Sequence, residues 1–300
     1  DEQARIRWYY TYPTGPGGAV DTSVTKHGVA IGSLGQFNSP IHIDWEGNIL
    51  WTGYPGGHHH FEIRPDGDSF LVLSSTFECP GDVSADVVSE VDFATGDTLW
   101  RWSHCEHWEP AGGFEVGWSH LNSIEPWSTP GQYLVSSRNQ DALFLIDPQV
   151  PSLEERLVWT LGRDGDFAPA QNIGGVSPRF WHQHDPQLLE SGNLLLFDNG
   201  VIGEREFSRF LELEIDTREM TYRAVWEYAP AAPIFSEIWG DADRLPNGNT
   251  LGVFGPDVEG NRLDVSIHEV NADGMVVWRG NSGRGVGIYR VQRVTPYLGH

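Results

Sequence analysis

A short strand-like segment that ends on a tryptophan recurs along the chain, and this repeat constrains the fold more than any other feature. The successive tryptophans are separated by 43, 49, 59, 67 and 52 residues. Most of the segments follow a polar turn, for example 44–47 and 271–274. The tryptophans are Trp8, Trp51, Trp100, Trp159, Trp226 and Trp278. Six copies of a unit of about 45–60 residues predict a β-propeller with four strands in each blade.

A second motif lies between the tryptophans and predicts the inner hairpin of each blade, because it reads as a strand, a glycine-containing turn and a returning strand. It is found at 59–67, 120–125, 184–194 and 240–251. Trp8 is too near the N-terminus to follow a whole blade, and 288–294 is strand-like. We therefore expect an all-β, six-bladed β-propeller whose termini share one blade and close the ring. A β-sandwich or two smaller barrels are the alternative all-β architectures.

Composition supports many short strands and limits the partners. The 35 glycines and 19 prolines suit strands joined by turns, and residues 1–300 are expected to form one domain. The 19 basic and 42 acidic residues give a net charge of −23, which disfavours nucleic-acid and anionic-membrane partners. No apolar run approaches the roughly 18 residues of a membrane span. Residues 1–5 are expected to be an internal or mature start rather than a signal peptide, and the sequence leaves the oligomeric state open.

Histidines occupy equivalent places in three of the predicted inner hairpins. His59 lies eight residues before Gly67, and His184 lies eight residues before Gly192. His120 aligns with them through the sequence that follows it. One histidine at a strand end most often bonds a neighbouring carbonyl. Because equivalent positions on inner strands converge at one mouth of a propeller channel, three such histidines indicate a site.

Polar and aromatic residues extend this predicted site. Asn122 lies two residues after His120 and therefore on the same face of its strand. Arg138 ends the segment 133–138, which is expected to return antiparallel and bring the arginine back to the channel mouth. A guanidinium among histidines makes an anion site, because its planar fork matches sulfate, phosphate or carboxylate oxygens. The residues expected to contact a substrate there are His60, His182, Trp118, Trp181 and Trp239.

Several of these segments resemble the arylsulfotransferase (aryl-sulfate sulfotransferase) propeller family. The resemblance covers roughly residues 40–280 in unbroken motif order and fits a shorter branch of the family. The segments that carry it are 57–60, 118–124 with 136–140, 183–185 with 196–200 and 208–209, and the turn at 245–251.

The resemblance implies a six-bladed propeller that transfers a sulfuryl group between phenols without a nucleotide donor. Bacterial members act in the periplasm through a sulfated histidine. Carried onto this chain, His184 matches the nucleophile, whereas His120, Asn122 and Arg138 match the groups that hold the sulfuryl oxygens. His59, or its neighbour His60, matches a further channel histidine. The implied enzyme is a transferase that acts on a small aromatic anion and needs no cofactor.

Two other functions stay open from the residues alone. A divalent metal could be held by His59, His120 and His184, as in a lyase, hydrolase or oxygenase with open coordination positions. The propeller could also bind a ligand or a protein without catalysing a reaction.

The two cysteines bear on the compartment. Cys79 and Cys105 flank the Trp100 strand and lie near turns of consecutive strands, so they are predicted to form a disulfide rather than two free thiols. A disulfide indicates an oxidising compartment, and we expect a periplasmic or secreted protein.

Overall fold

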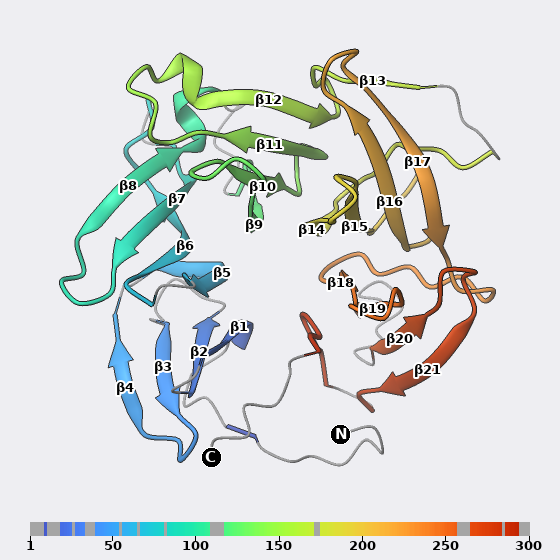
Figure 1. Ribbon diagram of the computed structural model, residues 1–300, viewed down its shortest axis with the longest axis horizontal. Helices are drawn as coiled ribbons and strands as arrows, with labels where there is room; N and C mark the ends of the chain where they lie inside the picture. The colour runs from blue at the N-terminus through green and yellow to red at the C-terminus, as the bar shows by residue number, and fades with distance from the viewer. Residues whose placement is uncertain are drawn as a thin grey trace. The chain divides into compact units, whose positions relative to one another are not determined.

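Short strands, nearly all paired antiparallel, make up the chain (Figure 1). The computed structural model describes residues 9–10, 19–25, 28–33, 40–53, 56–64, 67–80, 83–108, 117–170, 175–256, 265–283 and 286–293. Contacts divide the chain into two units, residues 1–103 with 294–300 and residues 104–293, and we describe each by itself.

The first unit contains two four-stranded antiparallel sheets, in which each strand pairs with the next along the chain. The strands of one are β1 (Ala19–Thr25), β2 (Gly28–Ser33), β3 (Ile41–Asp44) and β4 (Ile49–Thr52). The strands of the other are β5 (Gly57–Ile63), β6 (Ser69–Thr76), β7 (Ala85–Asp92) and β8 (Thr98–Ser103). Both follow the predicted order of an inner hairpin leading to an outer strand that carries tryptophan.

The second unit contains three sheets with the same order. One holds β9 (Leu121–Pro126), β10 (Tyr133–Ser137), β11 (Ala142–Ile146) and β12 (Leu157–Gly162). The next holds β14 (His184–Leu188), β15 (Leu194–Asp198), β16 (Arg209–Asp216) and β17 (Thr221–Tyr228), with the two-residue β13 (Ala168–Pro169) parallel to β17. The last holds β18 (Asp241–Arg244), β19 (Thr250–Phe254), β20 (Ser266–Val270) and β21 (Val276–Asn281). Two short 3₁₀ turns, His104–Glu106 and Glu154–Arg156, complete the elements.

Burial on both faces explains why the middle strands read as continuous apolar runs. Along β15, Leu194 and Leu196 join the core shared with the β9–β12 sheet, whereas Leu195 and Phe197 join the core shared with the β18–β21 sheet. Side chains alternate between faces along a strand, so a sheet packed on both sides needs apolar residues at every position. This layered packing of four-stranded sheets is that of a β-propeller, and the predicted all-β propeller class is confirmed.

The polar turns before the outer strands form because a side chain replaces backbone partners. In the turn between β3 and β4, Asp44 Oδ1 accepts the N–H groups of Glu46 and Asn48 at 3.0 and 2.8 Å. Asn271 does the same between β20 and β21, accepting the N–H groups of Asp273 and Met275 at 3.1 and 2.9 Å. Aspartate and asparagine favour turns for this reason.

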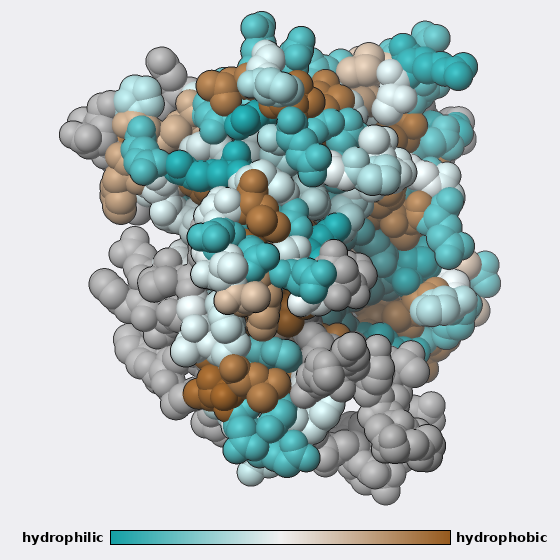
Figure 2. Space-filling view, turned by 60° about the vertical axis from the view of Figure 1, so that its left-hand side comes forward, coloured by the Kyte–Doolittle hydropathy of each residue, from teal (hydrophilic) through white to brown (hydrophobic). Residues whose placement is uncertain are grey.

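The outer strands carry the repeated tryptophans that the structure describes and half of the exposed large apolar side chains. Trp226 on β17 donates its Nε1–H to the carbonyl of Ala272 in the next sheet, at 2.9 Å. Leu50 on β4 and Val277 on β21 are about half exposed, at 52% and 53%. On the face shown in Figure 2, apolar residues form small groups among polar ones rather than one broad patch.

The described residues form five blades, which corrects the expected six. The predicted ring closure depends on residues 1–8, which include Trp8, and on 294–300. Both ranges lie outside the described residues. Residues 288–293 form no strand. Their polar groups bond to side chains instead: the Val291 N–H donates to Asp241 at 2.7 Å and Arg293 pairs with Glu269 at 2.5 Å. A segment anchored through carboxylates in this way does not contribute a ladder of backbone hydrogen bonds.

Two further features concern compartment and membrane. Cys79 and Cys105 are disulfide-bonded, as predicted. Within the described ranges, no helix has the length and apolar character that crossing a bilayer requires.

Candidate active site

The inner strands of the second unit begin with backbone in the left-handed region. His120, His182, Asp185 and Trp239 have φ values of +37°, +52°, +49° and +64°. The ladder between β14 and β15 also shifts register between His184 and Gln187. Non-glycine residues rarely adopt positive φ, and such strain concentrates at functional sites. The irregular backbone turns side chains away from the regular alternation of a strand.

His184 is the first residue of β14, and its side chain is buried with a residue exposure of 2%. Its Nδ1 lies 2.7 Å from Asn199 Oδ1 and 3.0 Å from the His182 carbonyl. Both neighbours are oxygen acceptors, so Nδ1 carries the proton. The unprotonated lone pair of a neutral His184 therefore resides on Nε2.

Asn199, which follows β15, fixes this assignment because its own orientation is determined. Its Nδ2 donates to the carbonyls of Ser236 and Trp239 at 2.7 and 2.8 Å, and the residue is fully buried. Rotating the amide by 180° would place its oxygen against two carbonyl oxygens. Oδ1 therefore faces His184, and the ring tautomer follows from the hydrogen-bond network.

Burial and nearby charged groups keep His182 and His184 neutral. Desolvation lowers the pKa of His184 well below its usual value, and Arg138, His120 and Arg290 lower it further, although the Asn199 bond opposes them. Desolvation, with Arg138, lowers the pKa of His182 to about 4. At neutral pH both rings are neutral imidazoles, and in His184 the lone pair on Nε2 is available as a nucleophile.

Arg138 lies beside His120, since its backbone N–H donates to the His120 carbonyl at 3.0 Å. Its Nη1 donates to Asn139 Oδ1 at 3.0 Å and its Nη2 donates to the Glu237 carbonyl at 2.9 Å. The Nε atom is buried and has no hydrogen-bond partner among the residues that the structure describes. Burial lowers the pKa of Arg138, opposed by the charges of Glu237 and Asp141, but an arginine retains its proton in proteins. The site thus holds a permanent cation with a donor that remains to be satisfied.

Asn122 and Gln183 form buried hydrogen bonds next to the cluster. Asn122 Nδ2 donates to the Gln183 carbonyl at 2.8 Å, whereas its Oδ1 is buried and finds no partner within the described ranges. The Gln183 amide nitrogen lies within 3.0 Å of three acceptors on the neighbouring sheet: Ser136 Oγ and the carbonyls of Ser137 and Ala142. These bonds tie the backbone before His184 to the β9–β12 sheet. Asn122 therefore holds the peptide that precedes the predicted nucleophile.

The segment 286–293 supplies residues that sequence reasoning did not assign to the site. Tyr289 packs edge-on to His184 with ring centres 6.0 Å apart. Arg290 donates to the Asn122 carbonyl at 3.1 Å and pairs with Asp185 at 3.0 Å. The sequence predicts a strand at 288–294, and this prediction gives its side chains no role at the site. Asn199 was also given no role, although it stands in the motif at 196–200 that carries the family resemblance.

The three predicted tryptophans have surroundings that differ from one another. The Trp118 ring packs edge-on to His104 with centres 4.7 Å apart, and the Trp239 ring lies 6.1 Å from that of Tyr289. Trp181 contributes to a separate pocket, described below.

Of the predicted residues, His59 and His60 belong to the first unit. His59 has a φ of +56°, a positive value like those of His120 and His182 in the second unit, and its Nδ1 lies 2.9 Å from His58 Nδ1. His60 Nε2 lies 3.6 Å from Glu62. Their convergence with His120 and His184 stays a prediction.

The described residues contain no group of three or more histidine, cysteine, aspartate or glutamate side chains placed to hold a metal ion. In the second unit the arrangement joins a buried neutral imidazole to an arginine, which suits nucleophilic attack on an anionic group.

These features define a β-propeller with a histidine–arginine cluster at the starts of its inner strands. A sequence model of the arylsulfotransferase family matches residues 1–278, and the chain belongs to this family. It is similar to the arylsulfate sulfotransferase AssT of Escherichia coli O6:H1 (strain CFT073), with 29% identity over 169 residues. That match covers 46% of this chain and only 27% of the relative.

A solved protein of unknown function from Bacteroides caccae has a similar fold, with a TM-score of 0.61 and 16% identity. The match covers 93% of this chain and 87% of that structure. Identity this low supports the shared fold alone.

Proposed function

We propose that this protein transfers a sulfuryl group from an aryl sulfate to a phenol, with His184 as the nucleophile. The observation that carries the proposal is the bond from His184 Nδ1–H to Asn199 Oδ1, which leaves the lone pair on Nε2. Family membership supports the reaction class. The short stretch shared with the Escherichia coli relative does not by itself extend that protein's activity to this chain.

The proposed reaction has two displacements at sulfur. In the first, His184 Nε2 forms a bond to sulfur while the bond from sulfur to the aryl oxygen breaks, and the electron pair leaves on the phenolate. In the second, the oxygen of the acceptor phenol forms a bond to sulfur and its proton passes to a base, while the bond from sulfur to His184 Nε2 breaks and its electron pair returns to Nε2. A covalent intermediate divides one difficult transfer into two easier steps.

The neighbouring residues take roles that follow from their charge and protonation. Arg138 holds the sulfuryl oxygens, because a fixed guanidinium stabilises charge that accumulates on an oxyanion in the transition state. Asn199 Oδ1 accepts the hydrogen bond from His184 Nδ1–H, and this bond stabilises the ring while it gains positive charge. His120, beside Arg138, is the proposed partner for the proton of the phenol. His182, with a pKa of about 4, is neutral at neutral pH and is a poor acid there.

The proposed compartment is outside the cytoplasm. The bond between Cys79 and Cys105 supports export, since disulfides persist in oxidising environments. The substrate class we propose is a small phenyl sulfate with a phenol as acceptor.

Turnover of p-nitrophenyl sulfate with phenol as acceptor tests the proposal. We expect release of p-nitrophenol from the natural sequence, loss of at least a thousandfold in His184→Ala, and little change in His107→Gln, a histidine outside this network. Without acceptor, intact-mass and peptide analysis should show one sulfuryl group on His184. Arg138→Gln should lower kcat/KM by about a hundredfold or more, in the range found for losing one oxyanion-stabilising donor.

The proposal fails if neither turnover nor the adduct is observed across a series of aryl sulfates. Activity that disappears on chelation and returns with a divalent metal would indicate the metal-dependent alternative instead.

A further inference from the structure

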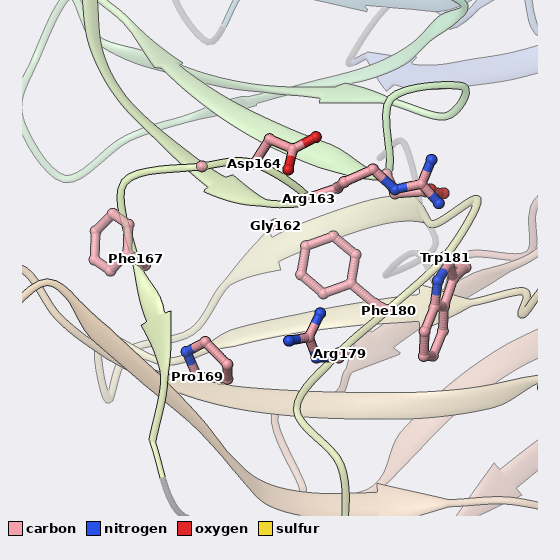
Figure 3. Close-up of a pocket in the computed structure, with 10 residues that line it drawn as sticks. Gly162, Arg163, Asp164, Phe167, Pro169, Arg179, Phe180 and Trp181 are labelled. Carbon is pink, nitrogen blue, oxygen red and sulfur yellow. The ribbon is translucent and has the colours of Figure 1, made fainter. Parts of the chain in front are cut away.

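A pocket lies in the 104–293 unit, between the connection from β12 to β13 and the segment that leads into β14 (Figure 3). Its volume is about 260 Å³. Pockets for drug-sized ligands usually exceed 300 Å³, so this one fits a ligand with a single ring. Its charged lining residues are Asp141, Arg163, Asp164 and Arg179, and its aromatic ones are Phe167, Phe180 and Trp181.

Of the two arginines that line this pocket, Arg179 is the one without a carboxylate partner among the described residues, and Asp164 also lines the pocket. Arg179 forms no ion pair with any residue in the described part of the chain, although most arginines of this unit are paired with acids. Its backbone is held, because the Arg179 carbonyl accepts a bond from Arg209 Nη2 at 2.8 Å. In a chain with a net charge of −23, an unpaired guanidinium on an anchored backbone is a preferred place for an anion.

Aromatic rings surround this charge. Phe167 and Phe180 are each only 4% exposed, so the core fixes their rings. Trp181 is fixed from another direction by Arg205, whose guanidinium carbon lies 5.4 Å from the ring centre. Figure 3 shows the Arg179 guanidinium next to Phe180, with Phe167 to one side and Trp181 to the other. The walls therefore suit a flat apolar ring.

A carboxylate connects the pocket to the predicted catalytic cluster. Asp141 pairs with Arg163 at 2.5 Å and accepts the backbone N–H of His182 at 2.8 Å. Arg163 is therefore neutralised, whereas Arg179 is not. A ligand in the pocket would lie across Asp141 from His182, outside the His184 cluster.

From this geometry we propose that the pocket binds a small aromatic anion, a single ring bearing a sulfate, sulfonate or carboxylate group. The anionic group bonds to Arg179 and the ring packs against Phe180 and Trp181. This site is additional to the cluster of Arg138 and His184, and it does not depend on sulfuryl transfer.

Titration with 4-fluorobenzenesulfonate, followed by ¹⁹F NMR and calorimetry on the full chain, tests the inference. The sulfonate sulfur is bonded to carbon and cannot be transferred as a sulfuryl group. We expect Arg179→Gln to weaken one binding event at least tenfold, whereas Arg218→Gln, an exposed turn arginine, should leave it unchanged. Arg138→Gln should weaken only the separate event at the catalytic cluster.

The inference is overturned if Arg179→Gln binds as tightly as Arg218→Gln, or if no binding is detected at millimolar ligand. If only Arg138→Gln affects binding, the proposal for this pocket is refuted and the proposed catalytic site is retained. If Arg179 is required but no aryl sulfate is turned over, the pocket stands and sulfuryl transfer fails.

Discussion

Replacing Asn199 with aspartate exchanges one amide nitrogen for oxygen at the centre of the candidate site. The Nδ2 bonds to the carbonyls of Ser236 and Trp239 are lost, and an oxygen then faces both. A buried hydrogen bond contributes about 0.5–1.5 kcal/mol, and unsatisfied carbonyls add a desolvation cost. We therefore expect the free energy of unfolding of Asn199→Asp to fall by about 2–4 kcal/mol at pH 8.

The pH dependence of this loss is more diagnostic than its size. In the natural sequence, His184 has a depressed pKa and binds no proton near pH 6. In Asn199→Asp, a carboxylate replaces the amide 2.7 Å from His184 Nδ1, and a carboxylate at that distance favours the charged imidazole. The folded variant therefore binds one additional proton, whether the proton resides on the imidazole or on the buried carboxyl. Its stability relative to the natural sequence should recover as pH falls, by up to about 1.4 kcal/mol per pH unit.

Urea unfolding between pH 5.5 and 8 measures this recovery, and long-range ¹H–¹⁵N NMR reads the His184 tautomer directly. Asn271→Asp adds the same charge in an exposed turn, so its change in stability should be small and independent of pH. A pH-independent difference for Asn199→Asp would contradict the reasoning. So would a His184 ring that carries its proton on Nε2 in the natural sequence.

Other expectations follow from buried charges, the disulfide and one further histidine. Asp198→Asn leaves two arginines without their buried acidic partner and should cost about 3–5 kcal/mol in denaturant unfolding; a cost below 1 kcal/mol would show that the pair is solvated. The bond between Cys79 and Cys105 closes a loop spanning 105 − 79 = 26 residues, and reducing it should lower the free energy of unfolding by about 3–4 kcal/mol. Thermal melting with and without reductant measures this loss, and an unchanged melting temperature would contradict it. His268 has a pKa of about 4 in the folded state against an ordinary 6.5, so unfolded chains bind more protons between these values. Stability should decline as pH falls from 6.5 towards 4, and His268→Gln should flatten that decline.

The blade architecture could be predicted because it depends on a local pattern repeated many times. Polar turns such as the one at Asp44 and continuous apolar runs such as 194–197 follow from side chains close in sequence. The count of six failed because 288–293 has strand-like composition but bonds through Asp241 and Glu269. Carboxylates more than 20 residues away along the chain decide the conformation of that segment, and strand propensity does not reveal them.

The candidate site could be located but not fully resolved from the sequence. Antiparallel return of a hairpin predicted that Arg138 comes back towards His120, and their backbone bond places them together. The role of Asn199 could not be predicted, because its orientation depends on carbonyls at positions 236 and 239. Backbone carbonyls are common to all residue types, so no sequence pattern marks them.

The left-handed backbone at His120, His182, Asp185 and Trp239 has a consequence for attempts to make this protein more robust. Each such residue costs of order 1–3 kcal/mol, most for a bulky side chain such as tryptophan. Glycine carries no such penalty, so a selection for heat resistance alone should enrich glycine at these positions. The gain in melting temperature would come from replacing residues at the starts of the inner strands of this unit, where the candidate site lies. Laboratory evolution of this scaffold should therefore screen for binding or turnover in the same round as heat resistance.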